Sequence, residues 1–282
     1  MFVKNLIGHS GCQLALISGA DGMLVRKQAD VAYNYRLKRQ CIKQSKFQST
    51  TVAAPKILSK GYQGDAFYFD MEYIQGKTLA STIAHLTVKE IFDLVKVLFK
   101  NLCLSEIKDE NVNRVFLNKI NSLPNPQNTD VCDLFNQAKK CLLAYDFSYV
   151  YKSPCHGDLT LENIIITPSK KLYLIDFLDS FYNSWIIDVA KLLQDVELKW
   201  SYRYEKPDMT RDIRLLVAKN ALLEELRKMK NGQKIIETVY YVLLLNILRI
   251  YPYAKDAVTI DFLKNSTQKT INIINSLKGE KI

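Results

Sequence analysis

The pattern of apolar and polar residues along the chain changes near residue 76. Before that point, short apolar runs separated by turn residues predict strands rather than long helices. We expect strands at 12–17, 23–28, 56–60 and 66–73, and one basic helix without glycine or proline at 30–48. The turn Gly19-Ala-Asp-Gly22 contains an Asp-Gly pair, which favours a hairpin between the first two strands.

After Gly76 the pattern is typical of helices. Thr87-Val-Lys-Glu90 is a capping box, which predicts a helix that runs to about Leu102. Two apolar runs around the turn at Pro168, Ile164–Ile166 and Leu172–Ile175, predict a β-hairpin. We expect further helices at 131–147, 185–200, 208–230, 233–250 and 258–277.

Composition narrows the class of protein. The chain has 282 residues, of which 48% are apolar, and a formal net charge of +10. This excludes a disordered or collagen-like chain, and the length suits two modest domains or one large one. Seven basic residues and only one acid, Asp30, occupy 26–46. This basic segment fits an anionic ligand, a nucleic acid, a membrane surface or a solvated helix face. No nucleic-acid-binding motif accompanies it, so we expect no nucleic acid.

The apolar runs are short. The longest one near the C-terminus, Val239–Leu245, is followed by Asn246, so we expect no membrane span. The Gly8-His-Ser-Gly11 segment interrupts any signal-peptide core. The six cysteines form no CxxC pair, and we interpret them as reduced thiols of a cytoplasmic protein. The oligomeric state is not indicated.

One stretch of the chain points to specific chemistry. It reads Cys155-His-Gly-Asp-Leu-Thr-Leu-Glu-Asn163, followed by the predicted hairpin and by Leu174-Ile-Asp176-Phe. An H-x-D-x-x-x-x-N motif, a hairpin and an Asp that ends an apolar strand resemble the catalytic core of the protein-kinase-like superfamily. The His-Gly-Asp form, and Ile-Asp-Phe without a following glycine, resemble the aminoglycoside phosphotransferase and choline kinase group, which phosphorylates small molecules.

This resemblance implies an α+β, bilobal kinase-like fold. A small N-terminal lobe would contain an antiparallel β-sheet and one helix, and the larger C-terminal lobe would be mostly helical. We expect residues 1–76 to bind the nucleotide, with a hinge near 72–76, and residues 77–282 to carry the catalytic and acceptor-binding residues.

The resemblance also implies roles for the motif residues. Asp158 would be the base that orients the acceptor hydroxyl, and ATP would be the phosphoryl donor. Asn163 and Asp176 would hold Mg²⁺, which prefers hard oxygen ligands. His156 and Asp188 would be structural, Asp188 by binding the backbone of the catalytic loop from the start of a helix, where an acid is also favoured by the helix dipole.

The resemblance places the phosphate-binding lysine on the second strand. Strand alternation puts Val25 and Lys27 on one face, which favours Lys27 over Arg26 for this role. A solvent-facing lysine is the alternative. The other residues implied to bind nucleotide are Gly8 and Gly11, in a loop over the phosphates, and Glu72, Tyr73 and Ile74, at the adenine.

Two features depart from a protein kinase. The glutamate that usually pairs with the strand lysine is missing, because no Glu precedes Glu72; Gln40 or Gln44 could hydrogen-bond Lys27 instead. Only twelve positions separate Asp176 from Asp188, which leaves no room for an activation segment. This spacing argues against a protein substrate and for a small-molecule acceptor.

The acceptor is less clearly indicated. Asp179 and Asp195 lie in segments expected near it, either as ligands of its hydroxyl or amino groups or as ordinary surface acids and caps. The Asp-Phe-Leu-Asp-Ser and Lys-Leu-Leu-Gln-Asp runs resemble bacterial phosphotransferases of surface-polysaccharide synthesis, which favours a sugar, polyol or amino-alcohol. A choline or ethanolamine kinase, a non-catalytic kinase-fold module, and a nucleic-acid or membrane binder are the alternatives.

Overall fold

The computed structural model describes residues 2–6, 12–19, 22–102 and 104–279. The chain forms two compact units. The first, which we call the β unit, contains Met1–Ser81 and Glu162–Ser180. The second, the helical unit, contains Thr82–Leu161 and Phe181–Ile282. The sequence analysis divided the chain by binding role, with the nucleotide assigned to 1–76 and the acceptor to 77–282. This assignment of binding roles stays a prediction.

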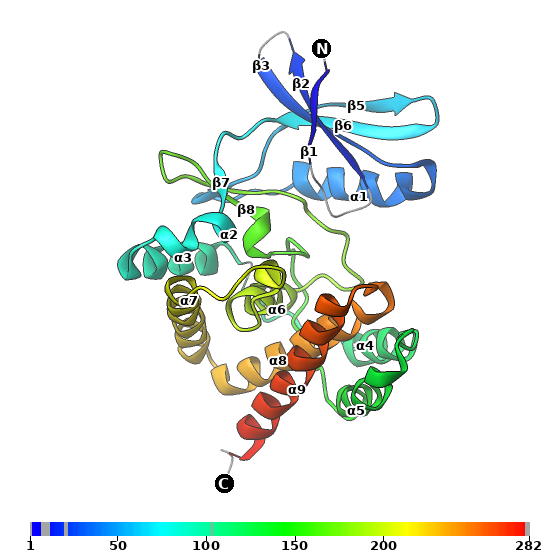
Figure 1. The fold of residues 1–282 in the computed structure, drawn as a ribbon, viewed down its shortest axis with the longest axis vertical. Coiled ribbons are helices and arrows are strands. Elements are labelled where there is room, and N and C mark those ends of the chain that lie inside the picture. The colour runs from blue at the N-terminus through cyan, green and yellow to red at the C-terminus, as the bar shows by residue number, and fades with distance from the viewer. Residues whose placement is uncertain (1, 7–11, 20–21, 103, 280–282) are drawn as a thin grey trace. The chain divides into compact units, whose positions relative to one another are not determined.

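The main sheet of the β unit is antiparallel and five-stranded, in the order β1-β2-β3-β6-β5 (Figure 1). One long helix, α1 (Asn34–Ser45), contributes Leu37 and Cys41, one turn apart, to the apolar core beside it. Sheet residues such as Val25 and Phe69 complete that core. The strands are β1 (Phe2–Leu6), β2 (Gln13–Gly19), β3 (Gly22–Gln28), β5 (Ile57–Gln63) and β6 (Ala66–Glu72).

A second, four-stranded sheet joins early and late parts of the β unit in the order β4-β9-β8-β7. Its strands are β4 (Val52–Ala53), β7 (Lys77–Thr78), β8 (Ile164–Ile166) and β9 (Leu172–Leu174). Gly76 precedes β7 at a point of close approach: a Cβ there would lie 2.6 Å from the Ile166 carbonyl oxygen and 2.5 Å from a methyl of Ile165. Glycine is therefore required where the expected hinge meets the hairpin.

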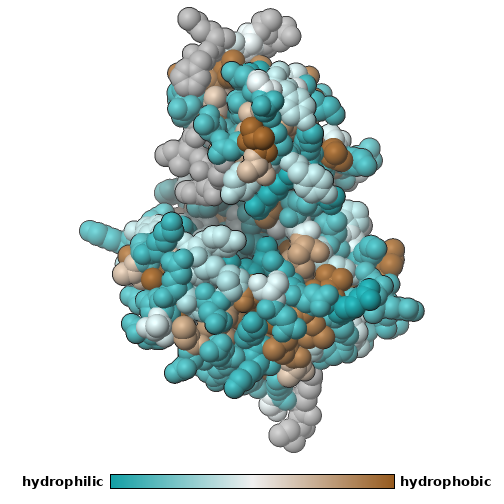
Figure 2. All heavy atoms as spheres, turned by 90° about the vertical axis from the view of Figure 1, so that its right-hand side faces the viewer, coloured by the Kyte–Doolittle hydropathy of each residue, from teal (hydrophilic) through white to brown (hydrophobic). Residues whose placement is uncertain are grey.

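The helical unit is built around α8 (Gly232–Leu248), which packs against α5, α6, α7 and α9. Gly232–Tyr253 is long and apolar enough to span a membrane, but 83% of its apolar window is buried inside the protein, as in a core helix. The face in Figure 2 is mostly polar, with separate apolar patches. The other helices are α2 (Leu79–Thr82), α3 (Val88–Asn101), α4 (Val112–Asn121), α5 (Cys132–Leu143), α6 (Trp185–Val196), α7 (Met209–Arg227) and α9 (Ala257–Gly279).

Local sequence rules explain most of these elements. Thr87 and Glu90 form the predicted capping box at the start of α3. The predicted β2–β3 hairpin is present, with Gly19 opposite Gly22, although Ala20 and Asp21 lie outside the described residues. Some predicted helices are too long: 30–48 begins only at Asn34, and 131–147 ends at Leu143. The predictions did not include β1, β4, β7, α2 or α4.

Candidate active site

The catalytic loop predicted from the His-Gly-Asp motif belongs to the helical unit. Its Gly157 has a φ of 92°, a conformation that favours glycine. The Asp188 carboxylate, in the first turn of α6, accepts hydrogen bonds from the backbone N–H groups of His156 (2.6 Å) and Gly157 (2.7 Å). The expected contact between Asp188 and the loop backbone is therefore present.

Asp158 is a partly buried carboxylate with a cationic partner. Its side chain is 29% exposed, and one oxygen lies 3.1 Å from Nζ of Lys191 on α6. Burial opposes ionisation of this carboxyl, but the nearby ammonium outweighs burial, so the pKa of Asp158 is below its ordinary value. His156 and Arg249 add to the same effect. Asp158 is therefore a carboxylate at neutral pH, the form that accepts a hydrogen bond from a hydroxyl.

Two further residues support this loop from inside the protein. His156 is buried, and its Nδ1 accepts the N–H of Asp158 at 3.2 Å. Asp195 is fully buried and accepts hydrogen bonds from Leu161 N (2.7 Å), Ser201 N (2.9 Å) and Ser201 Oγ (2.8 Å). Because both Asp195 oxygens bind these groups, we do not propose Asp195 as an acceptor ligand.

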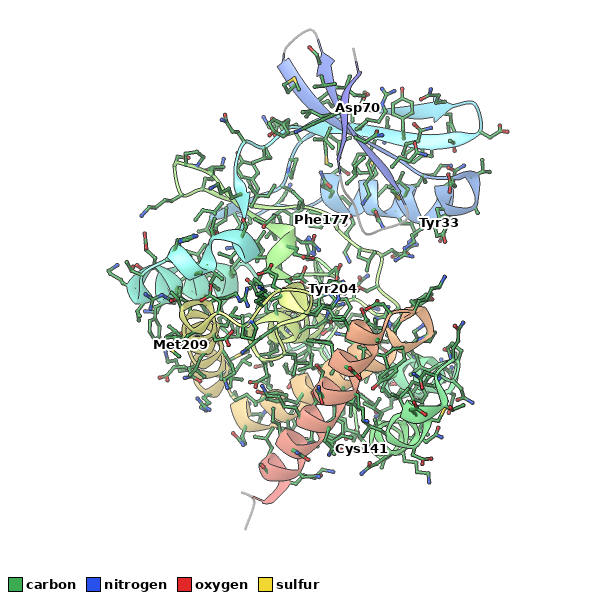
Figure 3. The ribbon with its side chains drawn as sticks, in the orientation of Figure 1. Tyr33, Asp70, Cys141, Phe177, Tyr204 and Met209 are labelled. Atoms are coloured by element: carbon green, nitrogen blue, oxygen red, sulfur yellow. The ribbon has the colours of Figure 1, made fainter. Side chains whose placement is uncertain are left out.

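In the β unit, strand alternation places Lys27 inside. Arg26 points the other way and forms a two-hydrogen-bond ion pair with Asp70 on β6, a residue labelled in Figure 3. Lys27 is buried; its ammonium donates to Oε1 of Gln40 at 3.0 Å and forms an ion pair with Asp176. The other glutamine considered, Gln44, donates to the Pro55 carbonyl instead, at 2.8 Å. The neutral partner of Lys27 is thus Gln40.

Asp176, the predicted metal ligand, has an unusual backbone conformation. It follows β9 with a φ of 61°, which is uncommon for a residue other than glycine and occurs often at functional sites. Asn163 ends the short helix η4 (Leu161–Asn163), and its carbonyl accepts the N–H of Ile175 at 3.0 Å. The strand pairing therefore holds the backbones of a carboxylate and an amide residue together.

This donor set fits Mg²⁺. The ion takes hard oxygen ligands and is usually bound by one or two carboxylates together with substrate phosphates and water. Among the described residues, no group of three or more His, Cys, Asp and Glu side chains could hold a metal. The described residues therefore contain no metal site formed by three or more such side chains. Asp176 and Asn163 offer one carboxylate and one amide oxygen, a protein contribution that suits an ion also bound by phosphates and water.

Helix α1 holds the segment after Asp176. Lys43 donates to the Leu178 carbonyl at 2.7 Å, and Arg39 forms an ion pair with Asp179 at 2.7 Å. Phe177, labelled in Figure 3, packs against Phe47 with ring centroids 5.2 Å apart. The Asp179 carboxylate is therefore paired with a cation of α1.

The remaining predicted residues lie at the end of β6, in the connection that follows it, or outside the described part of the chain. Glu72 ends β6, where its N–H donates to the Lys56 carbonyl at 3.0 Å, and Tyr73 and Ile74 follow it in an irregular connection to β7. Tyr73 is exposed, and its proposed contact with the nucleotide stays a prediction. Gly8 and Gly11 lie outside the described residues.

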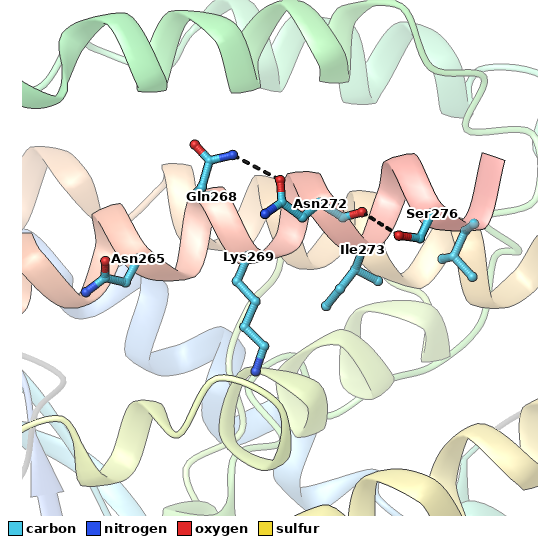
Figure 4. Close-up of a pocket in the computed structure, with 7 residues that line it drawn as sticks. Asn265, Gln268, Lys269, Asn272, Ile273 and Ser276 are labelled. Carbon is cyan, nitrogen blue, oxygen red and sulfur yellow. Dashed lines mark hydrogen bonds between the residues drawn. The ribbon is translucent and has the colours of Figure 1, made fainter. Parts of the chain in front are cut away.

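The structure adds residues that the sequence analysis did not single out. Lys191 follows Asp188 by three positions, so helical spacing alone would have placed both on one face of α6. Arg39 and Lys43 lie one turn apart on α1, but nothing in the sequence names their distant partners. A groove of about 560 Å³ along α9 was also not predicted (Figure 4). Its lining comes from α9 alone and includes no predicted site residue.

Comparison with known proteins gives a family and a fold. Residues 39–228 match the sequence profile of the phosphotransferase enzyme family (APH). No curated protein sequence matches the chain. The crystal structure of aminoglycoside phosphotransferase APH(4)-Ia is 13% identical over 98% of this chain and 93% of that one, with a TM-score of 0.66.

Two further solved structures have the same fold. Amicoumacin kinase hAmiN, in complex with AMP-PNP, Ca²⁺ and Ami, is 14% identical over 94% of this chain and 87% of its own, with a TM-score of 0.59. A putative fructosamine-3-kinase from Haemophilus somnus 129PT is 14% identical over 96% and 92%, with a TM-score of 0.52. At these identities the likeness concerns the fold, and it confirms the predicted α+β, kinase-like architecture.

Proposed function

Because the chain belongs to the phosphotransferase enzyme family, we propose that it is an ATP- and Mg²⁺-dependent kinase that phosphorylates a hydroxyl group of a small molecule. The observation that carries this proposal is the ion pair between Lys27 and Asp176, 149 positions apart. A buried lysine next to a carboxylate at a strand end supplies the cation and the metal ligand that triphosphate binding needs. AMP-PNP in the amicoumacin kinase complex supports ATP as the donor.

We assign the nucleotide to residues of the β unit. Lys27 binds the phosphates, and Gln40 orients its ammonium through their 3.0 Å hydrogen bond. Asp176 and Asn163 hold Mg²⁺, which neutralises charge on the phosphate oxygens when it is bound. The backbone of Glu72, Tyr73 and Ile74 contacts adenine. Gly8 and Gly11 are proposed to cover the phosphates.

We assign the acceptor hydroxyl to Asp158 in the helical unit. The ionised carboxylate accepts a hydrogen bond from the hydroxyl and orients its oxygen toward the γ-phosphorus. A bond forms between that oxygen and the γ-phosphorus, and the bond to the β-phosphate oxygen breaks with its electron pair leaving on ADP. The hydroxyl proton passes to Asp158. Asp188 and Asp195 keep the loop in place through its backbone N–H groups.

We propose a sugar, polyol or amino-alcohol of bacterial surface-polysaccharide synthesis as the acceptor. The charges around Asp158 support a neutral sugar or polyol most directly, because Lys191 and Arg249 both favour its ionised form. They disfavour choline or ethanolamine, whose cationic group would meet these side chains. A non-catalytic module is disfavoured because Asp158, Asn163 and Asp176 are all present. We place the enzyme in the cytoplasm, where ATP is available and where thiols such as those of the described cysteines stay reduced.

Thermal unfolding with and without Mg-ATP tests the nucleotide site. Ligand at a hundredfold excess over Kd adds about 2.7 kcal/mol, which corresponds to a Tm shift of roughly 5 °C, at about 2 °C per kcal/mol for a chain of this size. We expect Asp176→Asn to lose most of the shift. The neighbouring acid Asp179, paired with Arg39, provides a matched control, and Asp179→Asn should keep it. No shift in the wild type with ATP or GTP and either Mg²⁺ or Mn²⁺ would contradict the proposal.

Transfer of label from γ-labelled ATP then identifies the acceptor. The panel contains neutral sugars and polyols, amino-alcohols, choline and ethanolamine. We expect label on a sugar or polyol, and Asp158→Asn should abolish the transfer while the Mg-ATP thermal shift persists. Label on choline alone would instead favour a choline kinase.

A further inference from the structure

Helix α6 contacts the catalytic loop through three side chains that recur every three or four positions. Asp188 and Asp195 are carboxylates that accept backbone N–H groups of His156, Gly157 and Leu161. Lys191 lies between them and differs in kind, because its Nζ contacts a side chain, the Asp158 carboxylate, at 3.1 Å. This spacing puts all three residues on one face of the helix. Asp188 and Asp195 therefore bind the backbone of the loop, and Lys191 binds the carboxylate of Asp158.

Lys191 is exceptional within its helix. Every other residue of α6, from Trp185 to Val196, is buried, and the Lys191 side chain is itself only 14% exposed. An ammonium in such surroundings has a desolvation cost that an ion pair does not fully offset, so a pair like this is weak support for stability. An apolar residue would pack there at a lower cost. The pair is therefore better explained by what it does to Asp158.

The charged groups that face Asp158 come from three places. Lys191 contributes from α6, His156 from the loop itself, and Arg249 from the end of α8. Lys191 forms an ion pair with Asp158, and it has the largest effect of the three in favouring the ionised form. Removing Lys191 would therefore take away the strongest of these three effects that oppose the burial of the carboxyl.

We propose that Lys191 is a positioning residue, which fixes the orientation and the anionic form of the Asp158 carboxylate so that it accepts the hydrogen bond of the acceptor hydroxyl. This inference rests on the proposed function. The hydroxyl proton passes to Asp158, so Lys191 takes no part in the proton transfer. The residue acts through Asp158 and makes no contact with the substrate.

The test compares Lys191→Met and Lys191→Arg with a matched control. Lys219 is also a partly buried lysine, 22% exposed, whose ammonium lies 3.1 Å from a carboxylate, that of Glu197, so Lys219→Met removes a similar pair elsewhere in the helical unit. The first measurement is an NMR titration of the Asp158 carboxyl in protein labelled with ¹³C-aspartate, assigned with Asp158→Asn. It needs no acceptor, so it is independent of the proposed function.

We expect Lys191→Met to move the titration midpoint of Asp158 to higher pH, because the cation that favours the ionised form is gone. Lys191→Arg should bring it back toward the wild-type value, and Lys219→Met should leave it unchanged. An unchanged midpoint in Lys191→Met would overturn the proposal. If Lys191→Met does not fold, Lys191→Gln gives the same comparison with a polar side chain.

The second measurement is hydrolysis of Mg-ATP with water as the acceptor, followed against pH. Loss of orientation should lower kcat about ten- to hundredfold, while KM for ATP stays unchanged because Lys191 does not bind the nucleotide. The acid limb of the profile should move to higher pH together with the NMR midpoint. An equal loss of kcat in Lys219→Met would overturn a specific role for Lys191. A wild-type protein that neither binds nor hydrolyses Mg-ATP would instead refute the proposed function, and the positioning role with it.

Discussion

Lys27 donates a hydrogen bond to Gln40 across 3.0 Å, and both side chains are buried in the β unit. A neutral amide thus stands where the resembled family usually has a glutamate. Charge-assisted hydrogen bonds are roughly twice as strong as neutral ones, so the amide holds the ammonium less firmly than a carboxylate would. The carboxylate partner of Lys27 is Asp176, the proposed metal ligand. One lysine therefore connects α1 with the residue expected to bind Mg²⁺.

Replacing Gln40 by alanine tests this connection. Gln40→Ala leaves a buried ammonium with one partner fewer and should lower the free energy of unfolding by about 1–3 kcal/mol. It should also reduce the Mg-ATP thermal shift, because Lys27 is less well oriented. Gln44, buried one turn later and bonded to the Pro55 carbonyl, supplies the control. Gln44→Ala should reduce stability to a similar extent but keep the shift. Equal nucleotide shifts in the two variants would argue against a role for Gln40 at the phosphates.

The ion pair between Arg26 and Asp70 predicts a pH dependence of stability. Burial raises the pKa of Asp70, but the hydrogen bonds from Arg26 and Ser59 outweigh it, so the pKa is lowered from the ordinary value of 3.8. The folded protein binds this proton more weakly than the unfolded chain. The stabilisation is therefore present above pH 3.8 and is lost as the pH falls through the folded pKa.

We expect Asp70→Asn to lower the free energy of unfolding at neutral pH by about 2 kcal/mol, as measured by urea denaturation. The difference from the wild type should narrow as the pH is lowered below 3.8. Asp93, in an exposed pair with Lys89, gives a control: Asp93→Asn should leave the free energy of unfolding nearly unchanged. If the difference in the free energy of unfolding between Asp70→Asn and the wild type stays constant down to low pH, the ion pair does not cause that difference.

Gly76 should tolerate no side chain. In Gly76→Ala the new methyl group would collide with the Ile166 carbonyl and with Ile165, and relieving such overpacking costs about 1–3 kcal/mol. We expect a lower Tm, measured by calorimetry. Gly279, at the end of α9, has open space around the Cβ position, so Gly279→Ala should leave Tm nearly unchanged. Equal Tm values for the two variants would contradict the close approach.

Asp195 should matter for stability and not for acceptor choice. Asp195→Asn replaces one oxygen with an amide donor that faces N–H and O–H groups, which should cost about 2 kcal/mol. The relative rates with different acceptors should stay as in the wild type, measured by label transfer from γ-labelled ATP. The exposed acid Asp133 serves as the control, because Asp133→Asn should alter neither quantity. A changed acceptor preference in Asp195→Asn would restore the role expected from the sequence.

Local signals in the sequence were enough for much of the fold. The capping box at Thr87, the Asp-Gly pair that ends at Gly22 and the alternation around Lys27 each specify their structure within a few residues. The strands β4 and β7 were not predicted because each has two residues and depends on pairing with β9 or β8 about a hundred positions later. Local sequence cannot indicate that pairing.

Helix α4 was missed for a different reason. Its buried residues, Val112, Phe116 and Ile120, recur every four positions, which is a helical signal, but asparagines surround them and no side-chain cap marks the start. In the active-site region, the family resemblance implied the contact between Asp188 and the loop backbone, and that contact is present. Helical spacing from Asp188 places Lys191 and Asp195 on the same face of α6, but it does not name their partners, which are the Asp158 carboxylate for Lys191 and Leu161 N and Ser201 for Asp195.

The discontinuity of the β unit has a consequence for synthesis of the chain on the ribosome. Eighty residues, 82–161, are made between its two segments, which takes about 4–16 s at ordinary elongation rates. During this interval the nascent chain has the main sheet but not the partners of β4 and β7, and Lys27 still lacks Asp176. Those unpaired edges are the kind of surface that chaperones cover. A fragment that ends at Leu161 would keep this unfinished state permanently.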